Sequence, residues 1–363
     1  MAGAATLTAV ATDTFVSIPE VDLGEWRAGD RDRTAELVRR VCHEVGFFQL
    51  VNHGVPEEFV ARHMAHQRRL FALPESDKRR IDKALSPHFR GWEGVGAELT
   101  GGLPDLREQL DLSTENPVRG LDLDPPYLRL DGPNQWLDEE TLPGFRAHMS
   151  EYFERMSTLA DELLVVFSVG LGLDPGHLRD VFGERPLSFV KLISYPPTPA
   201  DGAGVNPHHD AGFLTLLLQH DAGGLQVRNP DGAWIDVPAR TDAFVVNIGE
   251  MLQEMTGNYF VATTHRVIAN EARQSSAWFH GPDLTTRLDP LPRGHTFDRG
   301  LGGLFQAGGL QGHCNLHRRP TRPEDCLEHL LGLAGEILLG EHLLIEHALN
   351  AAGKRVVVPG QQV

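Results

Sequence analysis

From Leu187 onward the chain consists of short runs of strand-forming residues separated by turn residues, and this pattern restricts the fold more than any other. The runs are bounded by Gly, Pro, Asn or Asp, and Asn229-Pro230-Asp231-Gly232 predicts a hairpin between two of them. Many short strands with such boundaries are typical of sandwiches and barrels of the jelly-roll kind. The expected strands are 188–195, 212–219, 224–228, 233–237, 243–247, 259–268 and 274–280.

Helical patterns flank this β-rich region on both sides. Apolar residues at helical spacing predict helices over 32–44 and 141–171, and Pro56 is well placed to begin another. Strand composition over 46–51 predicts one further strand in the N-terminal part. Residues 86–132 are rich in Gly, Pro and Asp and are expected to be irregular. An apolar helix is expected near the C-terminus, over 324–350.

The charge of the chain argues against two classes of partner. It has 33 Lys and Arg against 50 Asp and Glu, a net charge of −17 with no basic block, which disfavours nucleic acid and anionic membranes. No apolar run approaches the ~20 residues that span a bilayer, and residues 1–15 lack the basic start of a signal peptide. Cys42, Cys314 and Cys326 are too few for a disulfide framework. We expect a cytoplasmic protein, monomeric or weakly oligomeric, and its overall charge does not identify a substrate.

His208, Asp210 and His265 have the residue types and the spacing of a metal site. Alternate residues of a strand share a face, so His208 and Asp210 can point at one ion while His209 points away. His265 lies in the expected strand 259–268, from which it can reach the same ion. Two imidazoles and one carboxylate on one face form the triad that binds non-haem Fe(II) and leaves further positions open. The pattern by itself does not separate Fe(II) from Zn(II).

Arg273 and Ser275 follow His265 at the start of the next expected strand. Being two residues apart, they share a face of that strand, where a guanidinium and a hydroxyl can grip a carboxylate together. We therefore predict that this pair binds an acidic co-substrate close to the metal.

The chain closely resembles the iron(II)/2-oxoglutarate dioxygenases of the isopenicillin N synthase-like family over roughly residues 15–285. The segments that carry the resemblance occur along the chain in the order in which the family has them. These segments cover residues 46–56, 192–197, 208–217, 223–227, 247–252, 265–267 and 273–275.

The resemblance implies a mainly β protein with flanking helices and a double-stranded β-helix, or jelly-roll, core. It implies an enzyme that uses Fe(II), 2-oxoglutarate and O₂, and that couples decarboxylation of 2-oxoglutarate to succinate with hydroxylation of a small molecule. The implied iron ligands and catalytic residues are His208, Asp210 and His265, and the implied 2-oxoglutarate-binding residues are Arg273, Ser275 and Tyr195.

The expected organisation has four regions. They are an N-terminal dioxygenase region that packs on the core (15–130), a long helix that links to the core (131–185), the jelly-roll catalytic core (186–290), and a C-terminal loop and helix (291–363).

Two positions near the site depart from the family. Ile193 stands where many relatives have an asparagine, two residues before Tyr195, which puts a contact to the inner carboxylate of 2-oxoglutarate in doubt. His209 stands where relatives often have threonine, and we expect it to face away from the iron. For the substrate pocket, the candidates are Phe213, Leu217 and Phe279.

Several alternatives stay open at this stage. One is an Fe(II) oxidase of the same fold that does not use 2-oxoglutarate, like isopenicillin N synthase or aminocyclopropane carboxylate oxidase, and another is an ethylene-forming enzyme. A third is a jelly-roll binding protein without activity. The pairs Cys314-x-x-His317 and Cys326-x-x-His329 also offer ligands for a structural zinc ion, although a His-rich surface loop is the better explanation of them.

Overall fold

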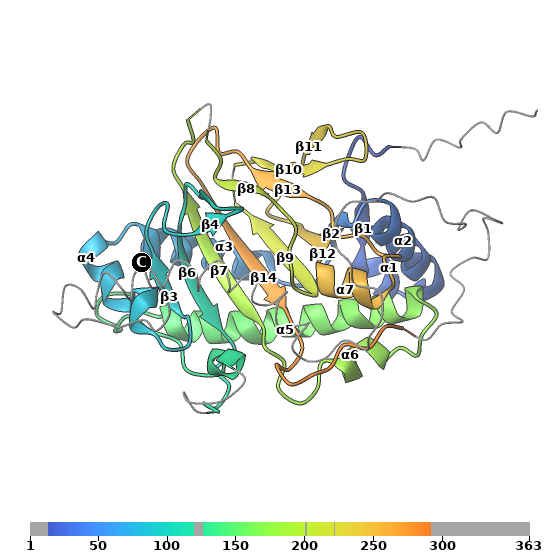
Figure 1. The fold of residues 1–363 in the computed structure, drawn as a ribbon, viewed down its shortest axis with the longest axis horizontal. Helices are drawn as coiled ribbons and strands as arrows, with labels where there is room; N and C mark the ends of the chain where they lie inside the picture. Colours follow the sequence, from blue (N-terminus) through green and yellow to red (C-terminus); the bar gives the residue numbers. More distant parts are fainter. Residues whose placement is uncertain (1–13, 120–125, 200–201, 221, 292–363) are drawn as a thin grey trace, which may run out of the picture.

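A computed structural model describes residues 14–119, 126–199, 202–220 and 222–291 of the chain. Two sheets dominate it, antiparallel except for the parallel pair β1–β2, and the smaller sheet lies over one face of the larger (Figure 1). They form a double-stranded β-helix that does not close into a barrel, as the sequence predicted. The larger sheet has the order β1 (Glu20–Asp22), β2 (Phe47–Val51), β12 (Phe244–Ile248), β9 (Leu214–Gln219), β14 (Arg273–His280), β7 (Phe189–Tyr195), β6 (Glu108–Ser113) and β3 (Gly91–Glu93).

The smaller sheet has the order β11 (Trp234–Asp236), β10 (Leu225–Arg228), β13 (His265–Val267) and β8 (Val205–His208). A two-stranded hairpin of β4 (Leu99–Thr100) and β5 (Leu103–Pro104) lies beside β8. The predicted turn at Asn229–Gly232 joins β10 to β11, so that Arg228 pairs with Trp234.

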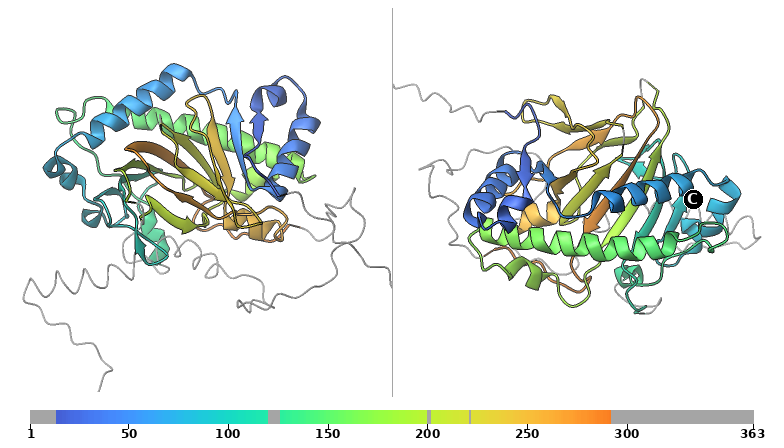
Figure 2. Two further views of the ribbon diagram at one scale, coloured as in Figure 1. Left: turned by 90° about the horizontal axis from the view of Figure 1, so that it is seen from above. Right: turned by 180° about the vertical axis from the view of Figure 1, so that it is seen from behind.

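The longest helices cover the outer face of the larger sheet, the face turned away from the smaller sheet (Figure 2). They are α2 (Arg31–Glu44), α3 (Glu57–Phe71) and α5 (Phe145–Gly170). Among the described residues, none of the helices has both the length and the apolar character that crossing a membrane requires. The short helices are α1 (Leu23–Arg27), α4 (Glu75–Lys78), α6 (His177–Val181), α7 (Glu250–Met255) and the 3₁₀ turns η1 (Arg79–Ile81), η2 (Lys83–Leu85) and η3 (Pro126–Leu130).

Alternation along β14 separates the two faces of the larger sheet. Trp278 and Ser276 point to the helices, where Ser276 meets His63 of α3 at 2.8 Å. Arg273, Ser275 and Phe279 therefore point to the inner face, toward the smaller sheet. The inner face is the one that can hold a ligand.

The predicted elements agree with the structure except in three places. The expected strand 259–268 is limited to β13, and β8 was not predicted as a separate strand. The prediction of an irregular segment over 86–132 was wrong, because β3 and β6 continue the larger sheet there. In β6 only Leu110 and Leu112 are apolar, since the inner positions hold the polar Gln109 and Asp111, and this hides the strand in the sequence.

The predicted helix over 324–350 and most of the expected region 291–363 lie outside the described residues. The candidate zinc ligands Cys314, His317, Cys326 and His329 lie outside them too.

Candidate metal and co-substrate site

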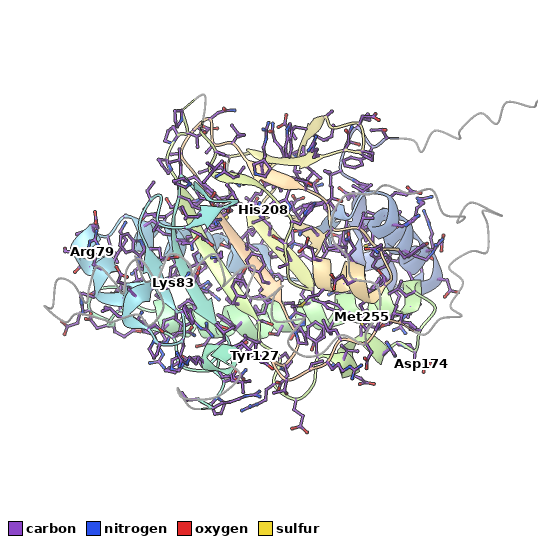
Figure 3. The ribbon with its side chains drawn as sticks, viewed as in Figure 1. Arg79, Lys83, Tyr127, Asp174, His208 and Met255 are labelled. Atoms are coloured by element: carbon purple, nitrogen blue, oxygen red, sulfur yellow. The ribbon has the colours of Figure 1, made fainter. Side chains whose placement is uncertain are left out.

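Two histidines of the smaller sheet face each other across neighbouring strands. His265 of β13 pairs in register with His208 of β8, and their ring centroids are 4.2 Å apart. Asp210 follows β8 by two residues, with its Oδ1 at 3.5 Å from His208 Nε2 and 3.6 Å from His265 Nε2. All three ligand atoms lie within 4.8 Å of one another, so they can contact a single ion. We call these three residues the triad; His208 is labelled in Figure 3.

Backbone carbonyls hold both imidazoles in the orientation that metal binding needs. His208 Nδ1 lies 2.8 Å from the carbonyl oxygen of Asn206, and His265 Nδ1 lies 3.1 Å from that of Thr263. An Nδ1–H that donates to a carbonyl leaves the Nε2 lone pair free, and here both Nε2 atoms face Asp210. Burial and the neighbouring His208 lower the pKa of His265 to about 4, so that this imidazole is neutral at neutral pH.

The larger sheet holds the carboxylate of the triad. Asp210 Oδ2 accepts hydrogen bonds from Thr215 Oγ1 at 2.6 Å and from Asn247 Nδ2 at 2.7 Å. Burial by itself raises the pKa of Asp210, but the two imidazoles and the Asn247 amide outweigh burial and hold that pKa well below its usual range. The carboxylate is therefore ionised, with Oδ1 directed at the imidazoles. Two imidazole nitrogens and one charged carboxylate oxygen form a donor set that suits Fe(II).

The structure places His209 outside the triad, as the sequence predicted. Its Nε2 lies 2.8 Å from Thr264 Oγ1, its Nδ1 lies 3.7 Å from Glu250 Oε1, and its side chain is exposed. Because the chain leaves β8 after His208, Asp210 reaches the triad from the loop rather than from the same strand. The alternation argument therefore paired two residues whose ligand atoms do converge, although only one of the two is in a strand.

Arg273 and Ser275 lie on the inner face of β14, where Arg273 pairs in register with Tyr195 of β7. The Arg273 side chain is 4% exposed, its Cζ lies 4.7 Å from the centre of the Tyr195 ring, and its Nη2 reaches Gln219 Oε1 only at 3.4 Å. Its Nη1 and Ser275 Oγ have no hydrogen-bond partner among the described residues. Buried polar groups are normally hydrogen-bonded. An anionic ligand with two acceptor oxygens would satisfy both donors, and the residues present therefore fit a carboxylate.

The position of this arginine relative to the triad follows from the register of β14. Phe279 of β14 pairs with Thr215, the residue that holds Asp210. Arg273 lies six positions before Phe279 on the same face, with Ser275 between them. A ligand that extends from the triad along the inner face of β14 therefore runs toward Ser275 and Arg273.

A cavity lies near the loop that carries Asp210. Its lining includes Gly212, two residues after Asp210, and the stacked rings of Phe189 and Phe279, 4.4 Å apart. Of the pocket candidates from the sequence, Phe279 lines this cavity, whereas Phe213 is fully buried against Phe182. Its apolar lining includes Phe89, Leu187, Phe189, Met251, Phe279 and Leu284, and its charged lining includes Lys83, Arg90, Glu98, Asp111 and Lys191.

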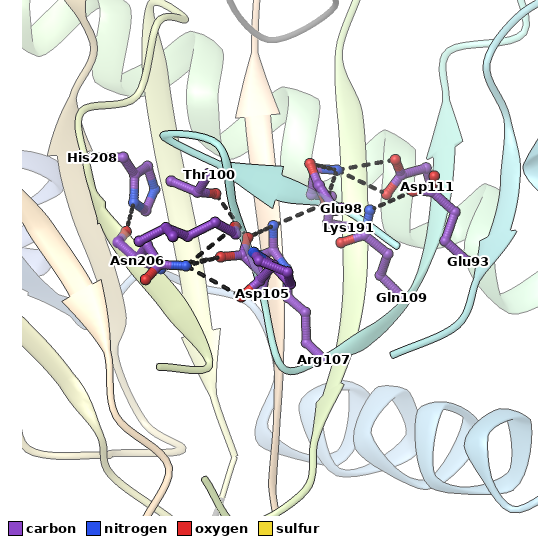
Figure 4. Close-up of polar contacts among 12 residues, drawn as sticks. Glu93, Glu98, Thr100, Asp105, Arg107, Gln109, Asp111, Lys191, Asn206 and His208 are labelled. Atoms are coloured by element: carbon purple, nitrogen blue, oxygen red, sulfur yellow. Dashed lines mark hydrogen bonds and ion pairs between the residues drawn. The ribbon is translucent and has the colours of Figure 1, made fainter. Parts of the chain in front are cut away.

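Apart from Arg90, the charged lining belongs to a buried network that ends beside the triad (Figure 4). Lys191 Nζ lies 3.0 Å from Asp111 Oδ2 and 3.1 Å from Glu98 Oε1, and Glu98 Oε2 lies 2.9 Å from Arg107 Nη2. Lys83 joins the network at 3.1 Å from Asp111 Oδ2. At the other end Arg107 Nη2 lies 3.2 Å from Asp105 Oδ2.

Asp105 connects the network to the triad. Its Oδ1 accepts from the backbone N–H of Asn206 at 3.1 Å and from Asn206 Nδ2 at 3.0 Å. The Asn206 carbonyl is the group that orients His208. The network thus contacts the cavity at one end and a triad histidine at the other.

Sequence reasoning missed the residues that support the triad, namely Thr215, Asn247, Asn206 and Asp105. A signal existed for Asn247, since it is the one polar residue of β12, Phe244–Ile248. A polar side chain inside an apolar strand needs a buried partner. No comparable signal marked Asn206, because it acts through its backbone carbonyl.

Two parts of the chain match known protein families. Residues 18–139 match the family described as non-haem dioxygenase in morphine synthesis N-terminal, and residues 186–282 match the 2OG-Fe(II) oxygenase superfamily. Together these matches cover the helical N-terminal part, both sheets and the triad.

Individual relatives agree with the family matches. The 2-oxoglutarate-dependent dioxygenase frbJ of Dothideomycetidae sp. (strain 11243) is 35% identical over 290 residues, covering 77% of each chain. The homoarginine-6-hydroxylase 2-ODD-C23 of Glycine max is 32% identical over 303 residues, covering 78% of this chain and 90% of its own.

Solved structures show the same fold. A full-length protein of Neurospora crassa, crystallised with alpha-KG and thymine, superposes with a TM-score of 0.66 at 26% identity over 76% of this chain and 88% of its own. JOX2, crystallised with 2OG, Fe and JA, gives a TM-score of 0.61 at 29% identity, over 76% of this chain and 78% of its own.

Proposed function

The chain belongs to the 2OG-Fe(II) oxygenase superfamily, and we propose that His208, Asp210 and His265 are the ligands of its Fe(II). It is a non-haem Fe(II)/2-oxoglutarate-dependent dioxygenase that acts on a small molecule with O₂ as co-substrate. The observation that carries the ligand assignment is the convergence of three ligand atoms, with both Nδ1 atoms already engaged by carbonyls.

We assign Arg273 and Ser275 to the distal carboxylate of 2-oxoglutarate, with the Tyr195 ring packed on the guanidinium. The support for this is the pair of buried donors without partners among the described residues, placed along β14 from the triad. Fe(II), when bound, supplies chelation of the 2-oxo acid and activation of O₂, which couples decarboxylation to oxidation of the substrate. The protein contributes orientation: Arg273 places one end of the co-substrate, and burial of the guanidinium strengthens its attraction for an anion.

The proposed reaction is hydroxylation of a small molecule held in the cavity beside the triad. Stacked Phe189 and Phe279 would contact an apolar part of the substrate, and the charged lining would contact a polar end. The relatives differ in what their names say they act on or bind: one is named for homoarginine, the Neurospora crassa protein was crystallised with thymine, and JOX2 with JA. The relatives named 2-oxoglutarate-dependent dioxygenases favour this reading over an oxidase that does not use 2-oxoglutarate.

We further propose that residues 15–130 and 131–185 support a catalytic core at 186–290, that residues 291–363 form an appended C-terminal region, and that the enzyme works as a cytoplasmic monomer. The buried free thiol of Cys42 is compatible with a reducing compartment. The net charge of −17 supports a partner other than nucleic acid.

An anaerobic titration tests the assignment. Addition of Fe(II) and then 2-oxoglutarate to the full chain is expected to produce the weak visible charge-transfer band of a chelated 2-oxo acid. His208→Ala should bind much less iron and produce no band, while His209→Ala, the adjacent control, should behave like the parent chain. Equal iron content in the parent and in His208→Ala would contradict the ligand assignment.

A further inference from the structure

Tyr195 has an arginine on each side on the inner face of the larger sheet. Arg273 is its partner on β14. On the opposite side, Glu108 of β6 pairs with Ser194 of β7. Arg107 is the residue just before β6. Continuing the register by one residue therefore places Arg107 opposite Tyr195. Only the first of these arginines has a role in the proposed function.

Arg107 is buried and carries an unsatisfied donor. It is 8% exposed, and its Nη2 is shared by Glu98 at 2.9 Å and Asp105 at 3.2 Å, but its Nε has no hydrogen-bond partner among the described residues. Burial favours the neutral form of the guanidinium, yet Glu98, Tyr195 and Asp105 outweigh burial and raise its pKa, so the side chain stays charged. A charged N–H left without an acceptor in a protein interior is costly and indicates a ligand.

Arg107 lies on the His208 side of the triad. Its ion pair with Asp105, the bond from Asp105 to Asn206 and the bond from Asn206 to His208 form a chain of three contacts (Figure 4). An anion bound at the triad beside His208 would therefore feel this guanidinium.

Apart from Arg273 and Ser275, which the proposed function assigns to the distal carboxylate, the inner-face positions beside Tyr195 offer no free donor within the described part of the chain. Ile193, two residues before Tyr195, is apolar and 3% exposed. Its partner across β6 is Gln109, whose Nε2 donates to Glu93 at 2.9 Å and whose free Oε1 is an acceptor that would repel a carboxylate. Arg107 Nε is thus the free donor at this corner of the described inner face that the proposed function does not already use.

We propose that Arg107 Nε–H donates to the inner carboxylate of 2-oxoglutarate, the one next to the oxo group, while Arg273 and Ser275 hold the distal carboxylate. This rests on the proposed function. The 2-oxo acid must present its inner carboxylate at the triad if it is to chelate the metal, and Arg107 is the arginine that the contacts through Asp105 and Asn206 link to His208. The ion pairs with Glu98 and Asp105 hold the guanidinium in place without occupying Nε.

Two ligands separate the roles of the two arginines. 2-Oxoglutarate has both carboxylates, whereas 2-oxovalerate has the same five-carbon chain and only the inner one. Anaerobic Fe(II) protein is titrated with each ligand, without primary substrate, and the charge-transfer band is followed.

Arg107→Lys keeps a cation beside Glu98 and Asp105 but lacks Nε–H. We expect it to weaken both ligands by a similar factor, roughly 10- to 100-fold for one charged hydrogen bond, and Arg273→Leu to weaken 2-oxoglutarate alone.

The controls distinguish an effect on folding or Fe(II) binding from loss of the contact between Arg107 and the carboxylate. Both variants must bind Fe(II) as the parent does, and Ile193→Asn in the Arg107→Lys chain should restore much of the 2-oxovalerate affinity, because it offers an amide donor from the adjacent strand. A general disturbance of the fold would not respond to that rescue.

Unchanged affinity of Arg107→Lys for both ligands would overturn the inference and leave the proposed function intact. Weakening of 2-oxoglutarate alone would overturn it as well, since it would place Arg107 at the distal end. If the parent chain formed no band with either ligand, the proposed function itself would fall.

Discussion

His265 lies directly opposite His208 on the antiparallel pair β13–β8, so the two imidazoles leave the smaller sheet on the same face. The carboxylate between them is held by Thr215 and Asn247, which are partners in register on β9 and β12 of the larger sheet. The triad therefore joins the two sheets, and its geometry depends on both of them.

Loss of the Thr215 hydroxyl should weaken iron binding without unfolding the protein. Thr215→Val keeps the shape of the side chain but removes a donor to Asp210 Oδ2, which leaves Asn247 alone to orient the carboxylate. Supporting contacts of this kind are worth about 10- to 100-fold in metal affinity. An Fe(II) titration under anaerobic conditions measures the effect, and Thr241→Val, on the exposed turn before β12, is the matched control. Equal affinities in the two variants would refute the role given to Thr215.

The triad and its co-substrate pair could be predicted from the sequence because His208 and Asp210, like Arg273 and Ser275, are two residues apart, although Asp210 lies in the loop after β8. His208, Asp210 and His265 meet as expected, and Arg273 lies with Ser275 on one face. The network around Asp105 could not be found in this way. Its members come from β6, β7 and the turns before them, and only the pairing of strands brings them together.

A methyl group at Gly249 should disturb the loop that carries Asp210. A Cβ at this position would lie 1.9 Å from the carbonyl oxygen of Gly212 and 3.0 Å from that of Asp210. Both oxygens belong to backbone, so the loop must move, and such overpacking costs about 1–3 kcal/mol. We expect Gly249→Ala to lower both the unfolding temperature and the Fe(II) affinity.

Gly223→Ala is the control for this substitution, because a Cβ at Gly223 would meet nothing within 4 Å. Thermal unfolding and Fe(II) titration of the two variants, side by side, measure the difference. If Gly249→Ala bound Fe(II) as tightly as Gly223→Ala, the close approach of these two loops would not matter for the triad.

A buried histidine pair behind the larger sheet should make the fold sensitive to acid. His63 Nδ1 lies 3.1 Å from His148 Nε2, and burial with neighbouring cations lowers the pKa of His148 to about 4. The folded state therefore binds fewer protons than the unfolded state between about pH 6.5 and pH 4. The free energy of unfolding is at its full value above this window and falls as the pH is lowered through it, by on the order of 1–2 kcal/mol.

His148→Phe tests this dependence while keeping a ring against Phe59. Urea unfolding at pH 7.5 and pH 5 should show a smaller pH effect in the variant than in the parent, although its stability at pH 7.5 should be lower because His63 loses a partner. The same pH effect in both proteins would rule out His148 as the source.

Removal of the Lys191 charge should destabilise the fold through the carboxylates that it leaves behind. Lys191 is 5% exposed and lies 3.1 Å from Glu98 and 3.0 Å from Asp111. Breaking a buried ion pair on one side costs about 3–5 kcal/mol, mainly because a buried charge is left without compensation. Urea unfolding at pH 7.5 should give Lys191→Met a free energy of unfolding that is lower than the parent's by an amount of this size.

The double variant Lys191→Met, Glu98→Gln should recover part of the loss, because it removes one uncompensated carboxylate. Glu98→Gln alone should be less stable than the parent. If the double variant were less stable than Lys191→Met, the two charges would not be coupled and the network would not stabilise the wall of the cavity in this way.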